Sequence, residues 1–267
     1  MVKNGSVTID NTEMYYASFG RGAKKLVVLP GLSDGLATVK GKAFVLVFPY
    51  IRFLNNYTVY MFSRKNDMPE GYTIRQMAED QAKAMKILGI EKANVLGVSQ
   101  GGMISQYLAI DYPAMVEKLI LAVTAPNANE VLTNVVSTWL DMVNDGDHTA
   151  LMVDTAQKTY SEKYVEKNEK YFPVLARFTK PKSYNRFLKN ANAILTFDAR
   201  EEMKNIKCPT LIIAGDNDKI IGNEAAYLLE KGISNSEIFI YEGLGHGAYE
   251  EAKDFYNRVF EFCGRKW

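Results

Sequence analysis

The feature that most constrains the fold of this chain is an apolar run that leads directly into a glycine-rich turn and a helix. The run covers residues 94–98, Ser99 follows at once, and a helix is predicted over residues 103–112. Gly97 and Gly101 stand two residues before and two residues after Ser99. A serine on a strained strand-to-helix turn lifts its hydroxyl away from the sheet, and the crowded flanking positions leave no room for a side chain. The pattern predicts Ser99 as a nucleophile; a glycine-rich turn with a bystander serine is the alternative.

Strand-like runs alternate with helical segments along most of the chain. This alternation predicts an α/β fold with a mostly parallel β-sheet and helices on both faces. A helix is expected to begin at Thr73, whose capping box is completed by Gln76, and to end at Gly89. A β-ribbon is expected at residues 7–9 and 14–19, and a last helix at residues 249–262. Six further strands are expected at residues 26–29, 58–62, 94–98, 118–123, 210–214 and 237–241.

Residues 126–205 interrupt this alternation. The segment is rich in aromatic side chains and has few strand-like runs, so we expect it to be mainly helical. A chain of 267 residues is long for one domain and short for two, which favours a single domain with an insertion. The predicted organisation is a core of residues 1–125 and 206–267, with residues 126–205 as a helical cap over one end of the sheet.

A serine nucleophile needs a base within hydrogen-bond reach, and the chain has only two histidines. His246 follows the last predicted strand, and its flanking glycines let the loop carry the ring over the sheet edge. His148 lies in a polar turn inside the insertion, where we expect it on the surface. His246 is therefore the predicted base, and a purely structural histidine is the alternative reading of that residue.

The imidazole of such a base needs an acid that orients it and stabilises its charged form. Asp216 and Asp218 follow the next-to-last predicted strand, so they emerge at the same sheet edge as the serine and the histidine. Both carboxylates qualify by position, and both could instead cap a turn, as aspartate does well. Glu130, which follows the preceding strand, is a substitute candidate.

Acyl transfer also needs donors for the oxyanion that forms on the carbonyl oxygen. The loop that contains Pro30 and Gly31 follows the first buried parallel strand, where a glycine lets the backbone approach a substrate closely. We predict that the backbone N–H groups of Leu32 and Gln100 form the oxyanion hole. An ordinary Pro-Gly loop is the alternative.

Charge and composition argue against several other classes. The 32 basic and 31 acidic residues leave a net charge of +1, which gives no support to nucleic-acid binding. Cys208 and Cys263 form neither a disulfide framework nor a metal-binding spacing. The longest apolar-rich stretch, residues 43–54, is too short to span a bilayer, and the first residues lack a signal-peptide core. We expect a cytoplasmic protein that needs no metal or cofactor. We expect it to act on a small molecule and not on a membrane, and a homodimer is possible.

Taken together, these motifs resemble the α/β-hydrolase family, and within it the small capped esterase-like members. The resemblance covers nearly the whole chain, and its markers lie at residues 27–31, 97–102, 112–121, 208–218 and 245–246. It implies Asp218, three residues after Gly215, as the acid in preference to Asp216. It also implies a helical cap between the strands near Val123 and Thr210, where the insertion is expected.

Besides Gly222, which stands where a proline commonly follows the acid loop, two loops depart from the family pattern. Pro30–Gly31 stands where the family usually has His-Gly, and residues 63–66, Ser-Arg-Lys-Asn, stand where it often has Asp-x-x-Gly. None of these departures touches Ser99, Asp218 or His246.

The resemblance and the three residues predict a serine hydrolase that cleaves a small carboxylic ester through an acyl-enzyme. The same triad could serve an aminopeptidase, acyltransferase, C–C hydrolase or lyase, because one fold hosts many chemistries. An aminopeptidase would want carboxylates that hold a free amine; Glu162, Glu166 and Glu169 are available, although their spacing also suits an exposed helix face. A non-catalytic ligand receptor that retains the pocket is the remaining alternative.

Overall fold

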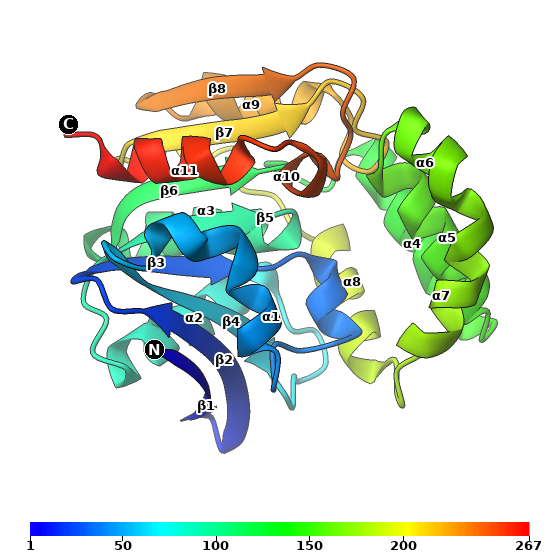
Figure 1. Cartoon of the computed structure of the whole chain (residues 1–267), viewed down its shortest axis with the longest axis horizontal. Coiled ribbons are helices and arrows are strands. Elements are labelled where there is room, and N and C mark those ends of the chain that lie inside the picture. The colour runs from blue at the N-terminus through cyan, green and yellow to red at the C-terminus, as the bar shows by residue number, and fades with distance from the viewer. Residues whose placement is uncertain (267) are drawn as a thin grey trace.

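The strands form one eight-stranded sheet in the structure, a computed structural model that describes residues 1–266 (Figure 1). The strands are β1 (Val2–Ile9), β2 (Thr12–Gly20), β3 (Lys24–Leu29), β4 (Tyr57–Lys65), β5 (Ala93–Val98), β6 (Val116–Ala122), β7 (Thr210–Gly215) and β8 (Ser236–Tyr241). Their order is β1-β2-β4-β3-β5-β6-β7-β8. The β1–β2 and β2–β4 pairs are antiparallel and the other pairs are parallel. The predicted α/β class with a mostly parallel sheet is confirmed.

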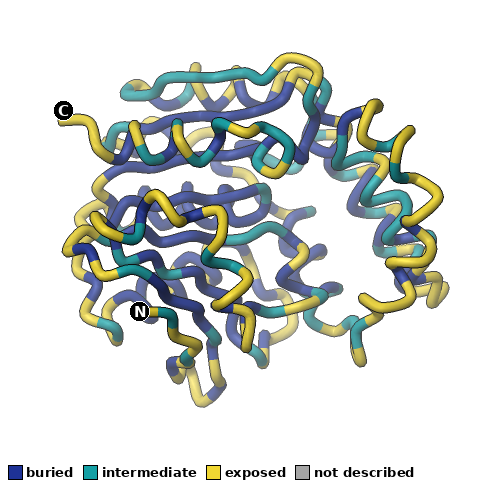
Figure 2. Tube along the Cα trace, viewed as in Figure 1, coloured by how far each residue is buried: buried dark blue, intermediate teal, exposed yellow. Residues whose placement is uncertain are grey.

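Helices cover both faces of the sheet. One face carries α1 (Ala43–Leu46), the 3₁₀ turn η2 (Phe48–Phe53), α10 (Ala248–Glu251) and α11 (Phe255–Gly264); the other carries α2 (Ile74–Ile87), α3 (Gln100–Asp111) and α9 (Glu224–Gly232) (Figure 1). Side chains of a strand point to opposite faces in turn, so Leu26 and Val28 join one apolar core while Val27 and Leu29 join the other. The central strands are buried almost throughout and β8 is half-buried (Figure 2).

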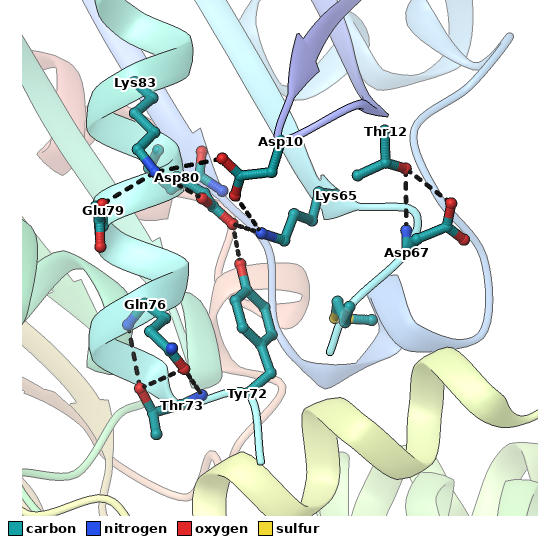
Figure 3. Close-up of polar contacts among 12 residues, drawn as sticks. Asp10, Thr12, Lys65, Asp67, Tyr72, Thr73, Gln76, Glu79, Asp80 and Lys83 are labelled. Atoms are coloured by element: carbon teal, nitrogen blue, oxygen red, sulfur yellow. Dashed lines mark hydrogen bonds and ion pairs between the residues drawn. The ribbon is translucent and has the colours of Figure 1, made fainter. Parts of the chain in front are cut away.

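Helix α2 begins where the sequence predicts. The Thr73 hydroxyl accepts the backbone N–H of Gln76 at 3.2 Å, and the Thr73 backbone N–H donates to Gln76 Oε1 at 2.9 Å (Figure 3). In the same view, Lys65 Nζ at the end of β4 lies 2.8 Å from Asp10 Oδ2 and 3.1 Å from Asp80 Oδ2. These ion pairs tie the end of β4 to α2 and to the turn between β1 and β2.

Five helices lie in the chain between β6 and β7, at one end of the sheet (Figure 1). They are α4 (Glu130–Asn144), α5 (His148–Thr159), α6 (Glu162–Asn168), α7 (Phe172–Thr179) and α8 (Asn185–Leu195), and we call them the cap. Helices α4 to α7 form an outer layer, and α8 lies between that layer and the sheet (Figure 1). The mainly helical character matches the expectation, whereas the boundaries 126–205 stay a prediction. Among residues 1–266, no helix combines the length and the apolar character that crossing a bilayer requires.

The single helix predicted over residues 249–262 is wrong. The chain forms α10 and α11 instead, because Ala252 adopts an extended conformation after α10. Long-range hydrogen bonds hold both sides of the break. The Glu251 carboxylate accepts the backbone N–H and the hydroxyl of Ser161 from the cap, and Asp254 accepts the Tyr241 hydroxyl from β8.

Candidate active site

Ser99 lies at the turn between β5 and α3, in a backbone conformation that residues with side chains rarely adopt. Its φ is +53° and its ψ is −120°. The chain packs so closely here that a Cβ at Gly101 would lie 1.9 Å from the carbonyl oxygen of Leu29, and one at Gly97 would lie 2.3 Å from the Ser105 hydroxyl. Both glycines are therefore required by the space around the turn.

The structure brings Ser99, His246 and Asp218 together from three separate loops. His246 Nε2 lies 2.9 Å from Ser99 Oγ, and His246 Nδ1 lies 2.8 Å from Asp218 Oδ2. The side chains of His246 and Asp218 are only 8% and 1% exposed. The other carboxylate oxygen of Asp218 accepts the backbone N–H groups of Ile220 and Ile221 at 2.9 and 3.0 Å, which leaves Oδ2 directed at the imidazole.

The other candidates lie in different surroundings. Asp216 accepts the backbone N–H of Gly243 at 2.7 Å and so caps a turn, and Glu130 is an exposed residue in the first turn of α4. The surface position predicted for His148 is wrong, since this residue is only 5% exposed. Helix α7 packs against the start of α5, where His148 Nε2 lies 3.2 Å from the Thr179 hydroxyl. That long-range packing left no local signal in the sequence.

The two predicted oxyanion donors flank the serine. Leu32 begins the 3₁₀ turn η1 (Leu32–Gly35) and Gln100 begins α3, so neither N–H has an acceptor within its own helix. A Cβ at Gly31 would lie 3.2 Å from the Cβ of Ser99, which shows how closely this loop passes the serine. The loop of residues 30–35, here called the oxyanion loop, therefore lies beside the turn that carries Ser99, and Leu32 and Ser99 line the same cavity.

A cavity of about 140 Å³ extends from Ser99 and His246 into the space beneath the cap. The core contributes Gly31, Leu32, Ser33, Leu36, Met103, Ile220 and Tyr249 to its wall, and the cap contributes Leu132, Val136, Trp139, Met152, Thr155, Thr159, Phe187 and Ile194. None of these side chains is an aspartate, glutamate, lysine or arginine. The cavity therefore suits an uncharged, largely apolar group.

The sequence shows that the insertion is rich in aromatic residues, but it does not tell which of them line the cavity; the structure places Trp139 and Phe187 there. Trp139 of α4 lines it, and the indole N–H of Trp139 donates to Asp154 Oδ2 of α5 at 2.7 Å. The three glutamates considered for amine binding, Glu162, Glu166 and Glu169, are exposed and do not line the cavity. Within residues 1–266, no group of three or more histidine, cysteine or acidic side chains is arranged to hold a metal ion.

A comparison with models of protein families identifies the family of this chain. A family model described as alpha/beta hydrolase fold matches residues 59–253, which is well over half of the chain. The chain belongs to the α/β hydrolase fold family. Membership supports hydrolase activity in general terms and leaves the substrate open.

Several α/β hydrolases are similar to the chain at low sequence identity. The AB hydrolase superfamily protein YisY of Bacillus subtilis is 29% identical over 205 residues, covering 73% of this chain and 75% of its own. RutD of Stutzerimonas stutzeri, named a putative carbamate hydrolase, is 24% identical over 211 residues, covering 74% and 78%. The solved enol-lactonase from Burkholderia xenovorans LB400 superposes with a TM-score of 0.83 at 21% identity, covering 98% of this chain and 100% of its own. At that identity the structural likeness shows the fold alone.

Proposed function

We propose that this chain is a serine hydrolase that cleaves a small carboxylic ester through an acyl-enzyme intermediate. The observation that carries the proposal is the hydrogen-bonded series Ser99–His246–Asp218, with distances of 2.9 and 2.8 Å, at the end of an uncharged cavity. A serine hydroxyl becomes an effective nucleophile when a positioned base can take its proton, and this series supplies such a base with its orienting acid.

The proposed reaction proceeds in two stages. Ser99 Oγ attacks the ester carbonyl while His246 Nε2 takes the serine proton, and the N–H groups of Leu32 and Gln100 hold the oxyanion. His246 then gives the proton to the departing alcohol, which leaves an acyl group on Ser99. Water deprotonated by His246 attacks this acyl group, and the carboxylic acid departs as Ser99 regains its proton. Asp218 keeps the imidazole oriented throughout and stabilises its charged form.

The cavity supports a small, neutral substrate. Its volume of about 140 Å³ is close to that of an apolar cavity that binds benzene. A free amine or carboxylate on the substrate would find no charged partner in the cavity wall, so an aminopeptidase reaction is disfavoured. The relatives named as putative carbamate hydrolases favour a carbamate as the second candidate, because the same attack on a carbonyl carbon would cleave it.

The test is hydrolysis of p-nitrophenyl esters from acetate to octanoate, beside an aryl carbamate, by the wild type and Ser99→Ala. We expect ester hydrolysis with short chains preferred, and a loss of roughly 10⁴-fold or more in the variant. Ser6→Ala, which removes an exposed hydroxyl on β1, is the matched control and should keep wild-type rates.

Two results would overturn the ester proposal. Faster turnover of the carbamate than of every ester would move the assignment to the second candidate. Absence of turnover, together with no labelling of Ser99 by a fluorophosphonate, would instead favour a ligand receptor.

A further inference from the structure

A buried charged network lies directly behind the oxyanion loop. Arg64, near the end of β4, and Asp34, in the oxyanion loop, have side chains that are each 1% exposed. The backbone N–H of Arg64 donates to Asp34 Oδ2 at 3.0 Å, and the Arg64 guanidinium lies 3.8 Å from the same oxygen. The guanidinium also donates from Nη2 to the side-chain oxygen of Gln100 at 2.9 Å. Arg64 thus touches both segments that carry the proposed oxyanion donors.

The cap helix α8 closes the network from the other side. Arg186 Nη2 donates to Asp34 Oδ2 at 2.9 Å, and the Gln100 side-chain amide donates to the carbonyl oxygen of Asn190 at 2.7 Å. A Cβ added at Gly35 would lie 2.8 Å from the Cα of Phe187, so the loop and the helix are in backbone contact. The oxyanion loop is therefore held between β4 and the cap.

Stability alone does not account for this arrangement. Arg64 Nε and Nη1 and Asp34 Oδ1 are buried and have no hydrogen-bond partner among the described residues. Burial lowers the pKa of Arg64 to about 10, which still leaves the guanidinium charged at neutral pH. Buried ion pairs with incomplete hydrogen bonding are often no more stable than apolar side chains of similar volume. A network that costs desolvation and contacts both segments that carry the proposed donors points to a positioning role.

We propose that Arg64, Asp34 and Arg186 are positioning residues that hold the N–H groups of Leu32 and Gln100 at the geometry that oxyanion stabilisation needs. The cap is then part of the oxyanion machinery as well as a wall of the cavity. Oxyanion donors act at 2.7–3.1 Å, and a misplacement of about 1 Å can cost about 100-fold in rate. This inference rests on the proposed ester hydrolase function, and it names the residues that position the oxyanion donors of that same site.

The decisive variant is Arg186→Met, because Arg186 is 20% exposed at the edge of the network and its loss should leave the fold intact. We expect kcat for a p-nitrophenyl ester to fall about 10- to 100-fold with KM within about twofold of wild type. Arg64→Met and Asp34→Asn should show the same pattern if they fold, and Arg186→Lys should recover part of the rate. Lys189→Met is the matched control: Lys189 lies on α8 and donates to Met68 O at 2.6 Å, outside the network, so kcat should stay within about twofold.

Binding of phenylboronic acid separates positioning from general loosening of the structure. Its tetrahedral adduct with Ser99 would place an oxygen at the oxyanion donors, so its Ki should rise by the same factor as kcat/KM falls across the variants. Unchanged kcat and Ki in folded Arg186→Met and Asp34→Asn would overturn this inference. The proposed function would still stand if the wild-type activity depended on Ser99. A wild type that neither hydrolyses esters nor reacts with a fluorophosphonate at Ser99 would overturn both.

Discussion

Individual side chains at the candidate site differ sharply in what they contact. Asp216 and Asp218 lie in one loop, yet Asp218 accepts two backbone N–H groups and faces His246, whereas Asp216 caps a turn through Gly243. The resemblance selected Asp218 by position, and the hydrogen bonds supply the physical difference between the two. A substitution that keeps the shape and removes the charge can therefore test the two residues against each other.

We expect Asp218→Asn to lower kcat for the preferred ester by about 10⁴-fold, because the amide no longer enforces the required imidazole tautomer or stabilises its charged form. Asp216→Asn is the matched control, since its side-chain oxygen can still accept the Gly243 N–H, and its kcat should stay within a few-fold. Steady-state kinetics with circular dichroism as a fold check measure both. Similar losses in the two variants would argue against the role assigned to Asp218.

A second prediction concerns Trp139, whose indole forms part of the cavity wall and donates a hydrogen bond to Asp154. Trp139→Ala should enlarge the cavity and shift the preferred p-nitrophenyl ester towards longer acyl chains. Removing a buried aromatic ring should also lower the free energy of unfolding by about 3–5 kcal/mol. Chain-length profiles and urea unfolding would measure the two effects, and an unchanged profile would mean that the acyl group does not reach α4.

At the scale of elements, the ends of a helix could be predicted where a local sequence signal sets them, and not where contacts between distant residues do. The capping box at Thr73 and the glycine at position 89 bracket α2 as predicted, since both act through neighbouring backbone groups. The break between α10 and α11 has no such local signal, and the hydrogen bonds beside it join Glu251 to Ser161 and Asp254 to Tyr241 from distant parts of the chain. A periodic apolar pattern continues across that break and so indicates one helix.

The capping role of Thr73 at the start of α2 can be tested by Thr73→Ala. Loss of the hydroxyl leaves the Gln76 N–H without its acceptor and should cost about 1 kcal/mol of stability, which lowers Tm by about 2–4 °C. Thr138→Ala is the matched control, because Thr138 is an exposed threonine inside α4, where alanine is the better helix former. Thermal unfolding should show a lower Tm only for the first variant; equal shifts would count against the capping role.

At the scale of the whole molecule, the packing of the cap predicts a pH-dependent stability. Burial lowers the pKa of His148 below its usual 6.5; it outweighs the backbone of Ala176, which raises this pKa, and the nearby Lys180 lowers it further. Below about pH 6.5 the unfolded chain binds a proton at this residue more readily than the folded chain does. The neutral histidine therefore contributes stability above that pH, and the contribution is lost as pH falls towards the folded pKa.

We expect the free energy of unfolding of the wild type to fall more between pH 7 and pH 5 than that of His148→Gln, which cannot titrate. Urea unfolding at the two pH values measures the difference. All other residues are the same in both proteins, so their contributions cancel in the comparison. Equal losses in the two proteins would show that His148 stays protonated to the same extent in the folded and unfolded states.

The strands of the sheet, the start of α2, the glycine-flanked turn at Ser99 and the placement of His246 after the last strand could all be predicted from the sequence. These follow from apolar periodicity, steric limits on the backbone and the presence of only two histidines. Other features depend on tertiary packing: the burial of His148, the apolar wall under the cap, and the contacts of Asp34, Arg64 and Arg186 behind the oxyanion loop. These groups are far apart along the chain, and packing between distant elements leaves no local pattern from which their contacts could be predicted.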